Sequence, residues 1–242
     1  MTIAQSQLTV TWEKLPDDYR LPDDPVDNST QPVLAFALTE SLAENNRLPA
    51  SSLTLTNYGV CATVNGKIVV KAPDWGFVPL IRVPRAAVER SYTPRLEGDN
   101  LTIVMEFLSE TEGTEYSVKP TYPPGKWFFY EQILQVINYA IFEPESGNLE
   151  FYRLNDAGQY KLQPSNDEQR YWVPEMQLFL GVWQGTRQNR TGNWLRWWTE
   201  SGDLLLWGSE LVAQARQLAQ QERERADRLA ERLRALNINP DD

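Results

Sequence analysis

Apolar and polar positions alternate differently in successive parts of the chain, and these changes predict its elements. Residues 1–30 show no apolar period and are rich in acids and prolines, which predicts an extended acidic arm. Residues 31–46 place apolar side chains at roughly helical spacing and predict one helix. From Leu53 short β-branched runs follow, and the turn signal Asn65-Gly66 between ATV and KIVV predicts two adjacent strands.

The middle of the chain carries further strand-like runs around a second helical segment. LTIVMEFLS is apolar on both faces, as expected of a central strand in a sheet, and only Glu106 interrupts it. The segment that begins at Lys126 has helical spacing, residues 139–142 have the pattern of a strand, and LEFYRL and QYKLQP predict a β-meander. This order of elements predicts an α/β or α+β core with a mixed central sheet and flanking helices.

Tryptophans crowd the part of the chain that follows. Five of the nine lie within residues 183–207: Trp183, Trp194, Trp197, Trp198 and Trp207. We favour a hydrophobic cluster that packs a C-terminal β extension onto the domain. A surface that stacks sugars or bases is the alternative.

From Gly208 the sequence predicts a long charged helix. Its apolar positions recur near helical spacing: Leu211, Ala215, Leu218, Ala226, Leu229, Leu233 and Leu236. Such a stripe indicates a coiled coil, although residues 220–225 interrupt it. We therefore expect a homodimer or another coiled-coil partner through residues 210–236. The patterns divide the chain into three regions: an acidic N-terminal arm over residues 1–30, a folded domain over 31–207 and the charged helix over 208–242.

Composition excludes several kinds of site. The chain has 242 residues, of which 41% are hydrophobic, enough for one domain with a buried core and an appendage. It contains no histidine, which excludes Ser-His-Asp, Cys-His and histidine-zinc sites. The single cysteine, Cys61, excludes an internal disulfide and is expected to be a small buried hydrophobe. Carboxylates, lysines, hydroxyls and a hard cation with oxygen ligands remain.

Charge and hydropathy bear on the partners. The formal net charge of −10 argues against a sequence-blind binder of polyanions, although a local basic groove or a bound metal is compatible with it. No uninterrupted apolar run reaches the ~18 residues that span a bilayer, so we expect a cytoplasmic protein with no membrane partner. The most basic part of the N-terminal half contains four arginines: Arg82, Arg85, Arg90 and Arg95. These arginines are candidates for phosphate contacts. For any single one of them, however, we favour the interpretation that it lies in a solvated loop.

Two acids and a lysine stand in positions that suit a metal-dependent phosphodiesterase. Asp74 follows a β-branched run, Glu106 lies inside an apolar one, and Lys126 begins the second helical segment. A carboxylate in an apolar strand is costly to bury unless it is paired or bound to a cation. Each residue also has a structural alternative. Asp74 could cap a turn, and Glu106 could form a buried pair with Lys126 that binds no metal.

Several motifs together resemble a known nuclease family. APDW, IVMEFLSE, GKWFFYEQ and NYAIFEP, followed by YWVPEMQLFLGVWQG and WLRWWTESGDLLL, are similar to a bacterial family of putative restriction endonucleases in the PD-(D/E)xK nuclease superfamily. The resemblance covers roughly residues 30–242. It implies a restriction-endonuclease-like core in which a central sheet with flanking helices brings two acids and a lysine to one edge.

The resemblance assigns roles to individual residues. Asp74 matches the aspartate of the PD element and Glu106 the acid of the (D/E)xK element, whereas Leu108 stands where the pattern has its lysine. The family takes its lysine from the following helix, and Lys126 occupies that place. Asp74, Glu106 and the backbone carbonyl of Phe107 would then hold Mg²⁺ or Mn²⁺, and Lys126 would orient the attacking water. The implied reaction is hydrolysis of a phosphodiester bond, with DNA as the expected substrate.

The sequence leaves undecided the roles of two further acids and the choice between two classes of function. Glu131, about one turn beyond Lys126, is given a supporting role at most, and Glu143 stands where the family commonly has an aspartate. Other polar residues are expected in a solvated turn: Ser109, Glu110 and Glu112. The first functional class is a divalent-metal endonuclease. The second is a catalytically inactive nuclease-like scaffold that acts as a protein-interaction or oligomerisation module. Glycan binding through the tryptophans is a weaker third option.

Overall fold

The computed structural model describes residues 8–19, 30–108 and 115–235 of the chain. It divides into two compact units, Met1–Leu205 and Leu206–Asp242. In its described residues the first unit is a mixed α+β structure built on three sheets, and the described part of the second contains one long helix.

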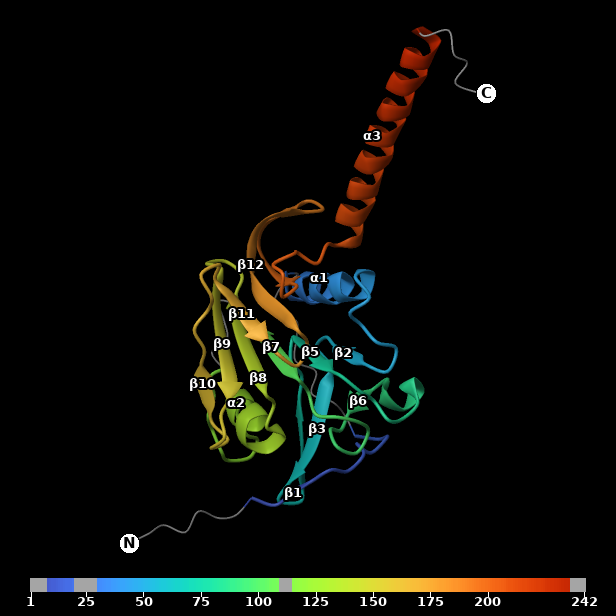
Figure 1. Cartoon of the computed structure of the whole chain (residues 1–242). Coiled ribbons are helices and arrows are strands. Elements are labelled where there is room, and N and C mark those ends of the chain that lie inside the picture. The colour runs from blue at the N-terminus through green and yellow to red at the C-terminus, as the bar shows by residue number, and fades with distance from the viewer. Residues whose placement is uncertain (1–7, 20–29, 109–114, 236–242) are drawn as a thin grey trace. The chain divides into compact units, whose positions relative to one another are not determined.

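A six-stranded mixed sheet lies at the centre of the first unit (Figure 1). Its strands, in spatial order, are β10 (Tyr160–Leu162), β9 (Asn148–Leu154), β8 (Asn138–Glu143), β7 (Ile103–Phe107), β5 (Trp75–Val78) and β2 (Leu53–Leu55). β7 and β8 run parallel, and the other neighbours run antiparallel. All residues of β7 are buried, as expected of a run that is apolar on both faces. The mixed central sheet and the β8–β10 meander that the sequence predicts are therefore confirmed.

A second sheet is formed by β1 (Val10–Thr11), β3 (Gly59–Val64), β4 (Lys67–Lys71) and β6 (Ser91–Tyr92). β3 and β4 are joined by Asn65 and Gly66, whose φ angles of 50° and 74° are both positive. Two such residues form the tight turn whose twist matches that of a hairpin. The turn predicted from this dipeptide is confirmed.

Part of the predicted acidic arm is folded. Its described part is residues 8–19, where β1 pairs with β3 and Leu15 is buried. The structure differs here from an extended arm because apolar side chains of this segment, including Val10, pack against the core. The rest of the predicted arm lies outside the described residues.

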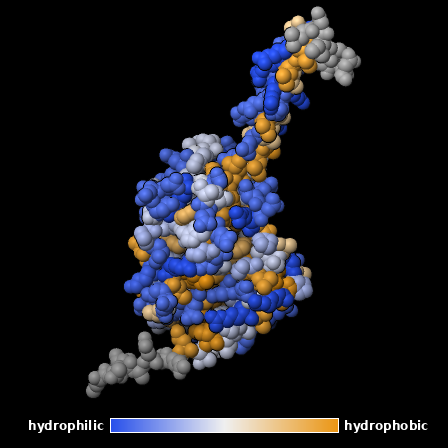
Figure 2. Space-filling view, in the orientation of Figure 1, coloured by the Kyte–Doolittle hydropathy of each residue, from blue (hydrophilic) through white to orange (hydrophobic). Residues whose placement is uncertain are grey.

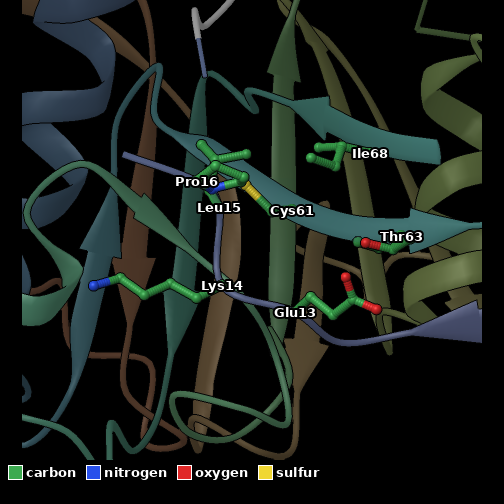
Figure 3. A pocket seen from close by; sticks show the side chains of 8 residues that line it. Glu13, Lys14, Leu15, Pro16, Cys61, Thr63 and Ile68 are labelled. Carbon is green, nitrogen blue, oxygen red and sulfur yellow. The ribbon is translucent and has the colours of Figure 1, made fainter. Parts of the chain in front are cut away.

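Cys61 in β3 is buried, as expected of a small hydrophobe, and burial raises the pKa of its thiol to about 11. It lines a cavity of about 40 Å³ together with residues of the N-terminal segment and of β3 and β4 (Figure 3). Figure 3 labels the acid and the lysine that border this cavity, Glu13 and Lys14. The cavity includes none of the three residues expected to form the active site.

Helices of different kinds flank the sheets. α1 (Thr30–Glu44) forms where the sequence predicts the first helix, and it packs against β13. The segment that begins at Lys126 has only one turn of α-helix, α2 (Lys126–Phe128), and continues as a π-helix, η2 (Phe129–Leu134). It ends earlier than its apolar spacing predicts because Gln135 adopts a left-handed conformation, with φ of 56°. A short 3₁₀ helix, η1 (Arg85–Val88), lies in the loop after β5.

The C-terminal part of the first unit is an antiparallel sheet of β11 (Arg170–Val173), β12 (Leu178–Arg187) and β13 (Arg190–Trp198). Trp194, Trp197 and Trp198 on β13 are buried, and the Trp197 ring lies 5.8 Å from that of Trp75 in the central sheet. These buried rings agree with the predicted hydrophobic cluster, and they are not available as a stacking surface for sugars or bases.

The second unit contains α3 (Gly208–Ala235), in agreement with the predicted long helix. No residue of α3 is buried. Leu236, the last position of the predicted apolar stripe, lies outside the described residues. Among the described residues, no helix has the length and apolar character needed to cross a membrane.

Candidate active site

The register between β5 and β7 brings the two predicted acids together. These strands pair antiparallel, with Trp75 opposite Met105. Asp74 precedes Trp75 by one residue and Glu106 follows Met105 by one, so the same register places the two acids opposite each other. The Phe107 N–H donates a hydrogen bond of 2.6 Å to Asp74 Oδ2. This bond holds the Asp74 carboxylate beside the end of β7.

Glu106 is fully buried, and each of its carboxylate oxygens accepts a hydrogen bond. Lys126 Nζ donates to Oε2 at 3.0 Å, and the Tyr130 hydroxyl donates to Oε1 at 2.9 Å. Lys126 opens α2 and Tyr130 lies in the π-helix that follows, so one short helical segment supplies both donors. The structure thus brings Asp74, Glu106 and Lys126 together at one edge of the central sheet.

Glu115 is a third acid beside Lys126, and the sequence analysis missed it. Its side chain is buried, with Oε1 3.7 Å from Lys126 Nζ. The Tyr139 hydroxyl donates a hydrogen bond of 2.9 Å to the Glu115 carbonyl oxygen, which anchors the backbone there. Glu115 follows a run of polar residues with no apolar period, so no sequence signal distinguished it from its solvated neighbours. Tyr130 was also missed, although its i,i+4 spacing from Lys126 is a usable signal for a shared helix face.

Burial controls the charge of this cluster. It raises the pKa of Asp74 to about 6, against the opposing effects of the Phe107 N–H and the Lys126 ammonium. Burial also raises the pKa of Glu106, more strongly than Lys126 lowers it. Burial alone would lower the pKa of Lys126, but Glu106 and Asp74 raise it above its ordinary value. The two carboxylates are therefore costly to ionise, and a second positive charge would stabilise them.

The donor atoms at this edge are oxygens, which suit a hard divalent cation. The Phe107 carbonyl oxygen accepts a hydrogen bond of 2.8 Å from Gln31 Nε2, which leaves it a second lone pair. Within the described ranges, no group of three or more histidine, cysteine, aspartate or glutamate residues could hold a metal ion. A cation would therefore rest on Asp74, Glu106, the Phe107 carbonyl and water. The residues present fit Mg²⁺, which is usually bound by one or two carboxylates and keeps several waters.

The structure does not bring the candidate phosphate-binding arginines to this edge. They follow the C-terminal end of β5, whereas Asp74 precedes its N-terminal end. Arg82 forms an ion pair with Asp99, and Arg85 donates to a backbone carbonyl at 3.2 Å. Arg90 donates to two backbone carbonyls of the N-terminal segment. Their contacts thus anchor loops on the far side of the strand from Asp74.

The other acids considered from the sequence have partners away from Lys126. Glu131 Oε1 accepts the Tyr160 N–H at 2.7 Å and so ties the π-helix to β10. Glu143 is exposed and accepts a hydrogen bond from the Ser146 hydroxyl in the following turn. The residues expected in a solvated turn lie outside the described residues: Ser109, Glu110 and Glu112.

Comparison with known proteins agrees with the resemblance carried by the sequence motifs. The family model described as Uma2, putative restriction endonuclease, matches residues 28–188. The match spans about two thirds of the chain, and it includes Asp74, Glu106 and Lys126. No curated protein matches the chain.

Proposed function

Because the chain belongs to the Uma2 family of putative restriction endonucleases, we propose that it is a divalent-metal-dependent endonuclease that hydrolyses phosphodiester bonds in DNA. Asp74, Glu106 and Lys126 carry this activity. The observation that supports it most strongly is the strand register that sets Asp74 opposite Glu106, with the Lys126 ammonium 3.0 Å from Glu106. The two acids are brought together by strand pairing, and the lysine by the helical segment beside it.

The two carboxylates are the cation-binding groups of the proposal. Asp74 and Glu106 would hold Mg²⁺ or Mn²⁺, with the Phe107 carbonyl as a further oxygen ligand. When bound, such a cation polarises a phosphoryl oxygen and acidifies a bound water. The Tyr130 hydroxyl orients the Glu106 carboxylate from the side opposite Lys126, as outer-shell donors do for metal ligands.

Lys126 has the charge expected of a group that stabilises a transition state. The neighbouring carboxylates raise its pKa, so it stays protonated at neutral pH. It is therefore suited to donate hydrogen bonds and to offset negative charge on a phosphoryl group, not to accept a proton. Glu115 is a second carboxylate within 3.7 Å of the ammonium, and it would keep Lys126 in place when Glu106 binds a cation.

One observation favours a second candidate function. Both oxygens of Glu106 already have donors within the chain, so the buried acid is paired without a cation. This suits a nuclease-like scaffold without activity, in which the acid and lysine form a structural pair and the protein serves interaction or oligomerisation. The net charge of −10 also favours this alternative over a general binder of nucleic acid.

Metal binding and DNA cleavage, measured on the same samples, separate the two candidates. Mn²⁺ binding by isothermal calorimetry and nicking of supercoiled plasmid would be compared in wild type, Glu106→Gln and Glu131→Gln. The last variant is the matched control, because Glu131 is a nearby glutamate that contacts β10 and not Lys126. The nuclease proposal expects Glu106→Gln to lose both binding and nicking and Glu131→Gln to keep both.

The opposite result would support the scaffold. Wild-type protein that takes up no Mn²⁺, together with a Glu106→Gln variant that is less stable in urea, would identify Glu106 as structural, because removing one partner of a buried ion pair is destabilising. The proposal also includes a cytoplasmic location. It further includes a dimer formed through residues 210–236, since two copies would suit an enzyme that cuts both strands of a duplex.

A further inference from the structure

α3 carries an apolar stripe, although none of its residues is buried. The helix is 28 residues long, about 40 Å. The side chains of Leu218 and Leu229 are 59% and 51% exposed. Figure 2 shows hydrophobic residues along this helix among hydrophilic ones. A largely polar helix that keeps leucines on one face has the pattern of a surface for another helix.

The stripe follows a period of eleven residues. Its described apolar members are Leu211, Ala215, Leu218, Ala226, Leu229 and Leu233. Eleven residues separate Ala215 from Ala226 and Leu218 from Leu229. At 100° per residue all six positions fall within a band of about 80°. An eleven-residue repeat drifts by only about 20° per repeat on a straight helix, so the stripe suits a long contact with a slight right-handed supercoil.

The stripe is also symmetric about its one charged position. Glu222 lies in the same band. Three pairs of apolar residues flank it, and the two members of each pair are equally far from Glu222 in the sequence. The pairs are Leu211 with Leu233 at eleven residues, Ala215 with Leu229 at seven, and Leu218 with Ala226 at four. The residues that interrupt the seam therefore stand at the centre of a palindromic pattern.

We propose that α3 is the docking surface for α3 of a second copy, packed antiparallel about a twofold axis at Glu222. This proposal does not depend on nuclease activity. Reversing the direction of one helix brings each member of a pair opposite the other. Leu211 then faces the partner subunit's Leu233, Ala215 faces the partner subunit's Leu229, and Leu218 faces the partner subunit's Ala226. One surface patch serves both copies, as a closed twofold interface requires.

Side-chain size favours the antiparallel arrangement over the parallel one. In the antiparallel pair, two of the three kinds of layer combine a leucine with an alanine, so the helix axes keep an even separation. A parallel pair would place Ala215 on the partner subunit's Ala215 and Leu218 on the partner subunit's Leu218. Layers that alternate between too little and too much volume pack less well than layers of large against small.

Charge is compatible with the same register. Arg225 Nη1 lies 4.0 Å from Glu222 Oε1 in the same helix. In the antiparallel pair Arg225 lies opposite the partner subunit's Ala219, about one turn from the partner subunit's Glu222. Two arginines then flank the two glutamates at the axis. From residue 210 to residue 234, five acids and six arginines nearly balance, which suits another copy of this helix better than nucleic acid.

Cysteine pairing tests the direction of the helices in the full-length chain. Cys61, the single native cysteine, is buried, so we expect intermolecular disulfides to form only between introduced cysteines. We expect Ala215→Cys alone to give no intermolecular disulfide, because two copies of that position lie far apart in the antiparallel pair. A mixture of the Ala215→Cys and Leu229→Cys chains should give a disulfide between the two. A disulfide between two Ala215→Cys chains would overturn the proposal in favour of a parallel pair.

Sedimentation of the full chain tests the association itself. Leu218→Asp should abolish the dimer, and Gln217→Glu should leave it unchanged, since Gln217 lies outside the stripe. Glu222→Leu should strengthen association by at least about tenfold, because it completes the apolar seam in both copies. Circular dichroism would check that each variant keeps its helix. A wild-type chain that stays monomeric at every concentration, or a dimer unaffected by Leu218→Asp, would overturn the proposal.

Discussion

The edge of the central sheet and the surface of α3 depart from ordinary residue placement in opposite ways. At the sheet edge two acids, Glu106 and Glu115, are buried. On α3 the leucines at 218 and 229 are more than half exposed. A buried carboxylate is costly for an isolated chain, and an exposed apolar stripe is informative in a way that a single exposed leucine is not.

Each departure would be explained by something that the chain is proposed to bind. A divalent cation would compensate the carboxylates at the sheet edge, and a second copy would cover the stripe on α3. The two regions differ in whether the chain itself already supplies contacts to these side chains. Glu106 has Lys126 and Tyr130 as partners, whereas the leucines of α3 have no cover within the helix. Experiments that remove one partner at a time can therefore separate the two explanations.

The largest effect is expected from Asp74→Asn. The variant removes one of two carboxylates from the proposed cation site, and nicking should fall by more than about a hundredfold, since outer-shell groups alone account for ten- to hundredfold effects. The asparagine oxygen can still accept the Phe107 N–H, so the fold should persist in circular dichroism. Asp99→Asn, at an acid paired with Arg82, is the matched control and should nick normally. Nicking by Asp74→Asn within a few-fold of wild type would contradict the assignment.

A tenfold to hundredfold loss of Mn²⁺ affinity is expected from Tyr130→Phe, measured by calorimetry. The variant keeps the buried ring and removes the hydrogen bond to Glu106 Oε1. Tyr160→Phe is the matched control, because the Tyr160 hydroxyl donates to the Val136 carbonyl at 3.0 Å, away from the acids. Equal affinities in the two variants would show that Tyr130 only fills space.

The change in Mn²⁺ affinity per pH unit should be smaller than the effect of Asp74→Asn. Because the pKa of Asp74 is raised from 3.8 to about 6, the folded chain holds a proton in this range that the unfolded chain has lost. Asp74 therefore stabilises the metal-free fold fully below about pH 4, and this contribution is lost as the pH rises through about 6. Mn²⁺ competes with this proton and with the one that burial retains on Glu106, whose pKa is raised to about 8, so its affinity should fall by up to about tenfold per pH unit below about 8 and more steeply below about 6. Calorimetry across this range would contradict the account if Asp74→Asn had the same slope as wild type.

The smallest effect is expected from Arg82→Gln. The Arg82 side chain is 56% exposed and its ion pair with Asp99 is on the surface. Such pairs contribute less than about 1 kcal/mol, so the free energy of unfolding in urea should change by no more than that. Mn²⁺ affinity should stay at the wild-type value, since Arg82 lies beyond the far end of β5. A large loss of plasmid nicking with unchanged stability would instead indicate that this loop contacts DNA.

The sequence predicted the parts of the site that depend on local pattern. The apolar run around Glu106 identified a buried central strand, and the family motifs identified Asp74 and Lys126. The turn at Asn65-Gly66 followed from the backbone that these two residues favour. These features are predictable because a few neighbouring residues determine them.

The missed features depend on contacts between distant segments. Glu115 is buried because its segment lies against Lys126 and Tyr139, which its polar neighbours in the sequence do not indicate. The helix that begins at Lys126 is wound as a π-helix, although its apolar spacing suits an α-helix equally well. Arg90 bonds to carbonyls of a segment more than seventy residues earlier, so its role could not be predicted from its basic surroundings.

The thermal unfolding midpoint with and without Mn²⁺ tests the central claim most directly, because a cation that binds only the folded chain must raise it. The account predicts that Mn²⁺ raises the midpoint of wild type and of Glu131→Gln, and leaves that of Glu106→Gln unchanged. An equal rise in wild type and Glu106→Gln would show that the cation binds elsewhere. No rise in wild type would show that Glu106 and Lys126 form a structural pair.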